Sequence, residues 1–137
     1  ERGLHMTRQI YVNLPVSDLE RSKKFFGSLG FGFEPKFTNE KAACMVVADN
    51  IYAMLLQDEF FKTFIDKPLA DATQATGVTV CLSCDSRAQV DETVAKAAKA
   101  GGRTHRKPTD HGFMYWHAFE DPDGHIWELV HMQGSPQ

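Results

Sequence analysis

The chain has 137 residues, a length that suits one ordinary domain or two half-size modules sharing a core. Hydrophobic residues make up 42% of it and charged residues 24%, which excludes a wholly disordered chain. The formal net charge of −3 provides no basic surface for nucleic acid or an anionic membrane, and no apolar run approaches the roughly 20 residues that span a bilayer. We therefore expect a globular protein with neither a nucleic-acid nor a membrane partner.

The cysteines and the chain start indicate a reducing, cytoplasmic location. Three cysteines do not make a disulfide framework. Cys81 and Cys84 fall within a predicted strand, so their thiols point to opposite faces and a redox or zinc pair is not expected. Residues 1–5 precede Met6 and lack the apolar segment of a signal peptide, and we interpret them as left by recombinant expression.

A first module is predicted over residues 6–57. Residues 9–16 alternate between apolar and polar side chains, which predicts a strand. Ser17 and Glu20 form a capping box, so a helix is expected to begin at Ser17 and to end at Gly30. Three short strands follow, at residues 31–37, 42–48 and 51–57, with a tight turn at Asp49-Asn50 between the last two.

A connector over residues 58–76 separates this module from a second one at 77–132. Apolar residues at helical spacing in the connector predict a short amphipathic helix. The second module starts with a strand at 78–84 and a helix that Ser86 and Gln89 cap and Gly101-Gly102 end. Three more strands are expected, at residues 103–107, 113–120 and 125–132, and residues 133–137 form a tail.

The two modules have the same β-α-β-β-β order, offset by roughly seventy residues, which indicates an internal repeat. Two sheets that each carry a helix on one face can bend together around a cleft. The predicted fold is therefore α+β, with two βαβββ modules forming an open, cleft-enclosing mixed sheet.

The hairpin near the chain end carries the first candidate functional residue. Asp121-Pro-Asp-Gly supplies all four positions of a type I turn. In the strand that follows, Ile126, Glu128 and Val130 point to one face, and Trp127, Leu129 and His131 to the other. If the Glu128 face is enclosed, the carboxylate must be paired, protonated or coordinating a cation. If that face is wet, Glu128 is simply solvated.

Two histidines and a tyrosine precede this strand. Asp110 could orient His111 as a general base, or it could cap a loop tip on which His111 is exposed. Tyr115 and His117 share one strand face and could join Glu128 in a polar site if that face lines the cleft. The opposite face of the same strand carries Met114, Trp116 and Ala118.

Three motifs resemble those of the vicinal oxygen chelate superfamily: Val16-Ser-Asp-Leu-Glu-Arg-Ser, Leu29-Gly-Phe, and Asp121-Pro-Asp-Gly-His-Ile-Trp-Glu-Leu. That superfamily includes glyoxalase I, extradiol dioxygenases, fosfomycin-resistance enzymes and bleomycin-resistance proteins. The resemblance spans essentially residues 7–132. It implies the paired βαβββ fold and, because these short chains resemble members that pair, a homodimer.

In catalytic members of that superfamily, a divalent metal is held by the first and last strands of each module. The resemblance places Tyr11, Met54, Thr79 and Glu128 at those positions. Only Glu128 is a good ligand for a hard divalent ion, so we expect no cofactor or a weakly bound divalent metal. The expected ligand-contacting residues are Tyr11, Asn13, Met54, Thr79 and Tyr115.

Three function classes remain open. The first, which we expect, is a glyoxalase/bleomycin-resistance-like protein that binds a small molecule, has a degraded metal site and can retain acid–base chemistry at Glu128. The second is a metal-dependent lyase, lactoylglutathione-lyase-like, or a dioxygenase that acts on a small oxygenated substrate. The third is a metal-independent lyase, isomerase or epimerase that uses Glu128 with His117 or His111.

Overall fold

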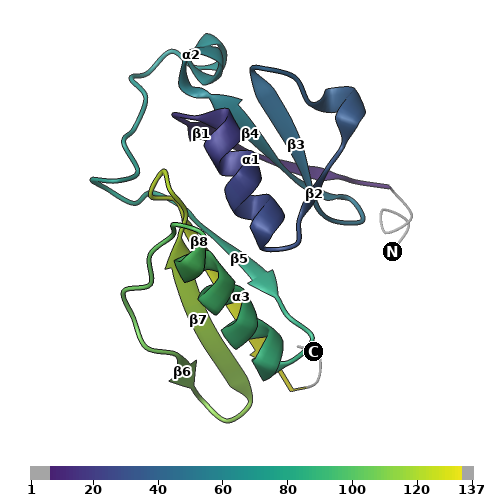
Figure 1. The fold of residues 1–137 in the computed structure, drawn as a ribbon, viewed down its shortest axis with the longest axis vertical. Helices are drawn as coiled ribbons and strands as arrows, with labels where there is room; N and C mark the ends of the chain where they lie inside the picture. Colours follow the sequence, from purple (N-terminus) through teal and green to yellow (C-terminus); the bar gives the residue numbers. More distant parts are fainter. Residues whose placement is uncertain (1–6, 134–137) are drawn as a thin grey trace. The chain divides into compact units, whose positions relative to one another are not determined.

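The structure, a computed structural model, describes residues 7–133 (Figure 1). The predicted expression remnant at 1–5 and residues 134–137 of the predicted tail lie outside the described residues. The chain divides into two compact units, Glu1–Leu69 and Ala70–Gln137. Each unit contains its own four-stranded mixed sheet. The predicted α+β class with two βαβββ modules is confirmed.

Unit 1 has a sheet with strand order β1-β4-β3-β2, in which β1 is parallel to β4. Helix α1 packs on one face of this sheet through Leu19, Ser22, Phe25 and Phe26. Burying a large apolar side chain stabilises the fold by about 1.5–3 kcal/mol, so the two phenylalanines anchor the helix. The elements are β1 (Ile10–Val16), α1 (Leu19–Ser28), β2 (Gly32–Phe33), the 3-10 helix η2 (Pro35–Phe37), β3 (Ala42–Ala48) and β4 (Ile51–Gln57).

Two predictions for unit 1 are wrong in detail. Asp18, rather than Ser17, is the N-cap of α1, and its carboxylate accepts the amide proton of Arg21 at 3.1 Å. A carboxylate caps as well as a hydroxyl and gains from the helix dipole. The strand expected at 31–37 contains only β2, because Pro35 has no amide proton for a ladder and starts η2 instead.

The connector contains two short helical turns, α2 (Asp58–Phe61) and the 3-10 helix η3 (Lys62–Phe64). The rings of Phe60 and Phe64 meet edge to face, with centroids 5.1 Å apart. The apolar spacing therefore forms helical turns, as predicted. No helix in residues 7–133 is long and apolar enough to cross a membrane.

Unit 2 repeats the arrangement with strand order β5-β8-β7-β6, in which β5 is parallel to β8 (Figure 1). Helix α3 lies along β7 and β8 and buries Val90, Val94 and Ala97. Ser86 caps it as predicted, because its hydroxyl accepts the amide proton of Gln89 at 3.0 Å. The elements are β5 (Thr79–Ser83), α3 (Arg87–Lys99), β6 (Thr109–Asp110), β7 (Met114–Glu120) and β8 (Ile126–Met132).

The predicted turn between β7 and β8 is confirmed. The Gly124 amide donates to the Asp121 carbonyl at 2.9 Å, and Gly124 has a φ of +89°. The Asp121 carboxyl is buried and accepts hydrogen bonds from the amides of Asp123 and His125 and from the Trp127 indole. Burial raises the pKa of Asp121 above its usual value despite these three donors. The carboxyl thus ties the turn to the core.

The prediction of a strand at residues 103–107 is wrong. Only Arg103 bridges to β7, opposite Glu120, and pairing resumes at β6. Pro108 has no amide proton to donate to a ladder, which favours an irregular segment between the two contacts. Residues 103–107 carry Arg103, His105, Arg106 and Lys107, and we call this segment the basic loop.

Candidate functional site

One face of the unit 2 sheet is covered by α3, and we call the opposite one the front face. The register places Glu128 opposite Ala118 on β7 and Cys81 on β5. Its neighbours Trp127 and Leu129 are buried on the α3 side. The predicted alternation along β8 is therefore confirmed, and Glu128 is half-buried on the front face.

Tyr115 and His117 lie on the α3 side of β7. The Tyr115 hydroxyl donates to Asp91 of α3 at 2.6 Å, and the Arg87 guanidinium lies 5.0 Å from the Tyr115 ring centre. His117 is opposite Leu129, which is buried. Of the two alternatives left open by the sequence, the Trp116 face is thus the one that accompanies Glu128, whereas Tyr115 and His117 lie on the side of β7 that α3 covers.

His117 instead supports the basic loop. Its Nε2 lies 2.8 Å from the carbonyl oxygen of Arg106, so Nε2 must carry a proton, because a carbonyl only accepts. Its Nδ1 is buried without a hydrogen-bond partner in residues 7–133. The His117 side chain therefore attaches the basic loop to β7 at a place where, among the described residues, no strand-to-strand hydrogen bonds form.

His111 is exposed, and Asp110 does not serve it. The Asp110 carboxylate accepts two hydrogen bonds from the Arg87 guanidinium, at 2.6 and 2.9 Å, and a third from the Gly112 amide at 2.8 Å. The Arg87 guanidinium, followed by the Gly112 amide, holds the pKa of Asp110 at about 2. Of the two alternatives, the structure shows the exposed loop tip, with Asp110 stabilising the turn.

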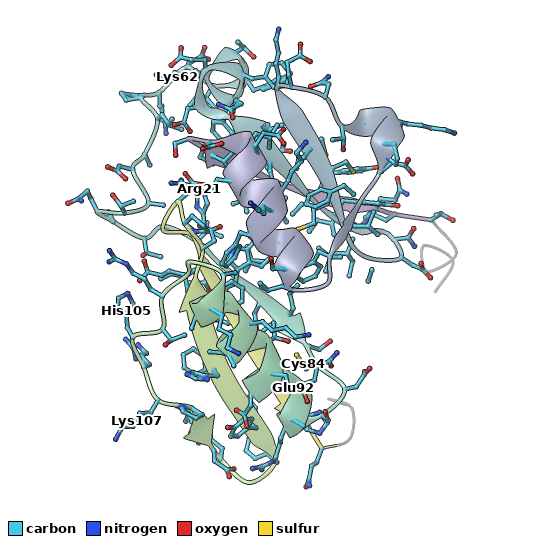
Figure 2. All side chains as sticks on the ribbon, in the orientation of Figure 1. Arg21, Lys62, Cys84, Glu92, His105 and Lys107 are labelled. Carbon is cyan, nitrogen blue, oxygen red and sulfur yellow. The ribbon has the colours of Figure 1, made fainter. Side chains whose placement is uncertain are left out.

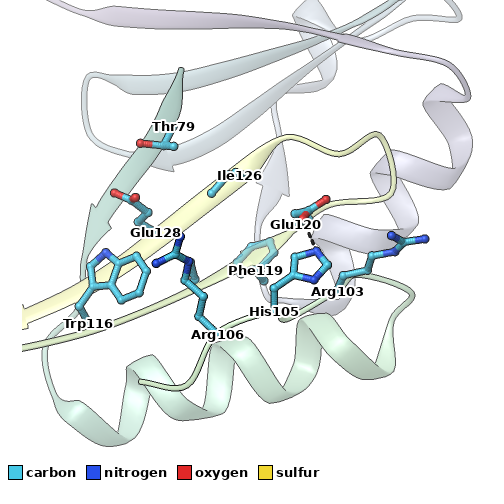
Figure 3. Close-up of a pocket in the computed structure, with 10 residues that line it drawn as sticks. Thr79, Arg103, His105, Arg106, Trp116, Phe119, Glu120, Ile126 and Glu128 are labelled. Atoms are coloured by element: carbon cyan, nitrogen blue, oxygen red, sulfur yellow. Dashed lines mark ion pairs between the residues drawn. The ribbon is translucent and has the colours of Figure 1, made fainter. Parts of the chain in front are cut away.

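A cavity of about 290 Å³ opens on the front face between the basic loop and strands β5, β7 and β8 (Figure 3). It brings together two residues expected from the sequence, Thr79 and Glu128, and three that were not assigned to a site, His105, Arg106 and Trp116. The complete lining is Thr79, Arg103, His105, Arg106, Trp116, Ala118, Phe119, Glu120, Ile126 and Glu128. We call it the front pocket.

The charges in the front pocket are only partly neutralised. His105 forms an ion pair with Glu120. Within residues 7–133, neither the Arg106 guanidinium nor the Glu128 carboxylate has a hydrogen-bond or ion-pair partner. In Figure 3 the Arg106 guanidinium points toward Trp116 and Glu128. Arg103 also lines the pocket, but its guanidinium extends away from Trp116 and Glu128 in Figure 3. The Arg106 cation and the Glu128 anion therefore lie beside the Trp116 ring.

The three expected ligand-contacting residues of unit 1 also share a sheet face. Tyr11 is opposite Tyr52, and Asn13 is opposite Met54, in the parallel β1–β4 pair. The Tyr11 ring stacks on the Tyr52 ring at a centroid distance of 4.9 Å, and its hydroxyl donates to Gln9. The front pocket contains none of them.

The donor set does not fit a divalent metal. In the described part of the chain, no group of three or more His, Cys, Asp or Glu side chains could hold one. At the positions that the resemblance implied, Tyr11 and Thr79 offer neutral hydroxyls and Met54 a soft thioether, which hard divalent ions do not prefer. Glu128 is the one good ligand among these four.

Sequence reasoning missed Arg106 because residues 103–107 were expected to form a strand. A signal was present in the flanking residues: Gly101-Gly102 before the segment and Pro108 after it are both unfavourable to a regular strand. Trp116 was one of two alternatives for the cleft-facing side, and only contacts with α3 decide between them.

Two βαβββ units, one of which has a pocket with charged residues in its lining, define the class of protein. The chain belongs to the Glyoxalase/Bleomycin resistance protein/Dioxygenase superfamily, whose family model matches residues 8–129. The resemblance seen in the sequence motifs is confirmed. Comparison with curated proteins gave no match.

Solved structures share the fold over most of the chain. A hypothetical protein from S. aureus, SA1046, is 26% identical, with a TM-score of 0.78 over 94% of this chain and 97% of that one. A glyoxalase/bleomycin resistance protein/dioxygenase family enzyme from Burkholderia phytofirmans is 15% identical, with a TM-score of 0.76 over 93% and 100%. The fosfomycin resistance protein FosX from Mesorhizobium loti is 19% identical, with a TM-score of 0.67 over 93% and 94%.

Proposed function

We propose that the protein binds a small molecule in the front pocket without a metal, and that Glu128 is the group that accepts a hydrogen bond or a proton from it. The observation that carries this proposal is the half-buried Glu128 carboxylate, which lines a cavity and has no partner in residues 7–133. A carboxylate removed from water without a partner is costly, so it is retained where a ligand supplies the donor. Superfamily membership supports a small-molecule ligand.

The neighbours of Glu128 favour acid–base chemistry over nucleophilic catalysis. Burial, followed by the charge of Glu128, raises the pKa of the adjacent Cys81 thiol. Cys81 therefore stays a neutral thiol, and the thiolate needed for attack or soft-metal binding is disfavoured. The Glu128 carboxyl is therefore the acid–base group of this strand pair, and the Thr79 hydroxyl, two residues from Cys81 along β5, can orient a bound oxygen.

A metal-dependent lyase or dioxygenase is the rival function, because the superfamily includes dioxygenases. The chemistry of the donor set argues against it, since Glu128 alone would hold a divalent ion weakly. Elemental analysis of tag-free protein dialysed without chelator distinguishes the two. We expect well under one equivalent of metal, and about one equivalent per chain would overturn the metal-free proposal.

The ligand site is tested by Glu128→Gln. We expect a thermal-shift screen of small polar compounds to find ligands of the wild-type protein, and Glu128→Gln to weaken the best of them about 10- to 100-fold, because a hydrogen bond to a charged group contributes about 1.5–3 kcal/mol. The melting temperature without ligand should hardly change. Glu92→Gln, which removes an exposed carboxylate on α3 (Figure 2), is the control and should bind normally. Equal affinities for wild type and Glu128→Gln would contradict the proposal.

The homodimer and the cytoplasmic location implied earlier stay predictions. Light scattering coupled to size-exclusion chromatography measures the first directly. A mass near 15.4 kDa would contradict the homodimer.

A further inference from the structure

Resting on the function proposed above, we propose that the front pocket selects a planar aromatic carboxylic acid that carries a ring hydroxyl or amino group. Arg106 binds the carboxylate, Trp116 stacks on the ring, and Glu128 accepts a hydrogen bond from the hydroxyl or amine. Three features of the pocket carry this inference: the state of its cations, the exposure of its tryptophan, and its size and charge.

Arg106 is the cation available to an acidic ligand. His105 is paired with Glu120, and the Arg103 guanidinium extends away from Trp116 and Glu128 in Figure 3. Lys107 extends outward from the sheet in Figure 2 and does not line the pocket. The Arg106 guanidinium points inward toward Trp116 and Glu128 in Figure 3. Its planar fork of N–H groups matches the two oxygens of a carboxylate.

The backbone of Arg106 is held in place before any ligand binds. The His117 side chain donates to the Arg106 carbonyl at 2.8 Å from within strand β7. A guanidinium carried by an anchored backbone loses less freedom on binding than one on a free loop. The anchored loop can therefore position the Arg106 guanidinium for a specific hydrogen-bonded contact with a carboxylate, in addition to attracting it by charge.

Trp116 provides the surface for a flat ring. The two tryptophans of the chain differ sharply: Trp127 is 0% exposed and stacks on Phe119, whereas Trp116 is half-buried and lines the pocket. The front-face neighbour of Trp116 along β7 is the small Ala118, which leaves room beside the indole. Offset stacking of aromatic rings is favourable beyond the burial of their area.

The size and charge of the pocket narrow the ligand further. A volume of about 290 Å³ is at the lower end of ligand sites, which suits a single-ring compound. One available guanidinium faces one available carboxylate, so a singly charged acid with a separate donor matches both. A phosphate dianion would meet repulsion from Glu128, and Arg106 is the unpaired cation of residues 7–133 that is directed into the same space.

The test compares matched probes by calorimetry and tryptophan fluorescence. The acids are 3- and 4-hydroxybenzoate and 4-aminobenzoate, and the neutral counterpart is 4-hydroxybenzamide. We expect at least one acid to bind at least tenfold more tightly than the amide, and to quench the emission of Trp116, since Trp127 is shielded. Benzoate, which lacks the donor for Glu128, should bind more weakly than that acid.

Loop variants assign the preference to Arg106. Arg106→Gln should abolish the preference for acid over amide, Arg106→Lys should restore part of it, and Lys107→Gln, which removes the same charge from the same loop outside the pocket, should retain it. Trp116→Leu should weaken the binding of all the ring compounds, whereas Trp116→Phe should keep most of their affinity. Circular dichroism verifies that each variant is folded.

Three results would overturn the inference. They are equal binding of acid and amide by the wild type, equal losses in Arg106→Gln and Lys107→Gln, and no binding of any acid. If compounds of another class bind and Glu128→Gln weakens them, the proposed function survives and only the ligand class is wrong. If no compound binds, both fail.

Discussion

The sheets of the two units have equivalent strand orders, but the front face of unit 1 carries neutral side chains and that of unit 2 carries charged ones. Cys44 in unit 1 and Ala118 in unit 2 occupy equivalent places, opposite Met54 and Glu128. In unit 1 the paired positions around them are neutral, and the exposed ring of Tyr11 is stacked on Tyr52. In unit 2 the corresponding face presents a carboxylate, a guanidinium and a tryptophan around a cavity.

The segment after each helix causes this difference. In unit 1 that segment hydrogen-bonds along β3: the Glu34 amide donates to the Cys44 carbonyl at 2.9 Å, and the Cys44 amide donates to the Thr38 hydroxyl at 3.1 Å. Cys44 is only 1% exposed as a result. In unit 2 the basic loop contacts β7 at Arg103 and through His117, and the front pocket opens beside it.

Two copies of one fold can therefore present different surfaces. One copy of βαβββ pairs the segment after its helix with β3 through hydrogen bonds, while the other leaves that place to a charged loop with a cavity beside it. The fold itself does not decide which copy does which, because function depends on the side chains grafted on it.

The largest expected effect is a difference in stability loss between tryptophan substitutions on the two faces of the unit 2 sheet. Trp127→Ala should lower the free energy of unfolding by about 3–5 kcal/mol, because it removes a fully buried indole and leaves a cavity. Trp116→Ala, the same substitution on the front face, should cost about 1 kcal/mol or less. Urea denaturation followed by circular dichroism measures both. Equal losses would mean that the front face is as tightly packed as the core.

The next effect compares turns in the two units. Gly124 and Gly30 both have positive φ, +89° and +103°. A Cβ at Gly124 would lie 2.8 Å from backbone atoms of Ala72 and Thr73, whereas a Cβ at Gly30 would have no neighbour within 4 Å among the described atoms. Gly30→Ala should therefore cost roughly 1–2 kcal/mol from backbone strain, and Gly124→Ala roughly 2–5 kcal/mol from strain and overpacking. Urea denaturation that ranked Gly30→Ala as the costlier change would refute this comparison.

The smallest expected effect is a difference between the two units in how one backbone amide of each responds to low pH. The folded pKa of Asp110, about 2, is below its ordinary value of 3.8, so its contribution to stability is complete above about pH 4 and is lost as the pH falls through about 2. The Gly112 amide, which donates to Asp110, should shift in NMR spectra with a midpoint near pH 2. The Thr38 amide of unit 1 donates to a backbone carbonyl and is the internal control. A Gly112 midpoint near 3.8, or no such shift, would disprove the assignment, and Asp110→Asn should abolish it.

Much of the architecture is local and was therefore predictable. The turn from Asp121 to Gly124, the cap at Ser86 and the alternation around Glu128 each depend on a few adjacent residues. Their geometry follows from dihedral preferences and from the two-residue period of a strand. The repeat and the superfamily motifs extend these local signals to the whole chain, so both units and the family could be inferred from the order of the amino acids.

The site depended on contacts between distant residues. Sequence alternation divides β7 into two faces, but only Asp91 and Arg87 of α3, by holding Tyr115, decide that Trp116 is on the front. The path of the basic loop is set by a bridge from Arg103 to Glu120 and a hydrogen bond from His117 to Arg106, both with partners more than ten residues away. Local propensities do not encode such pairings. The sequence by itself determined the repeated fold and the position of Glu128, and tertiary packing alone decided which charges and which ring surround it.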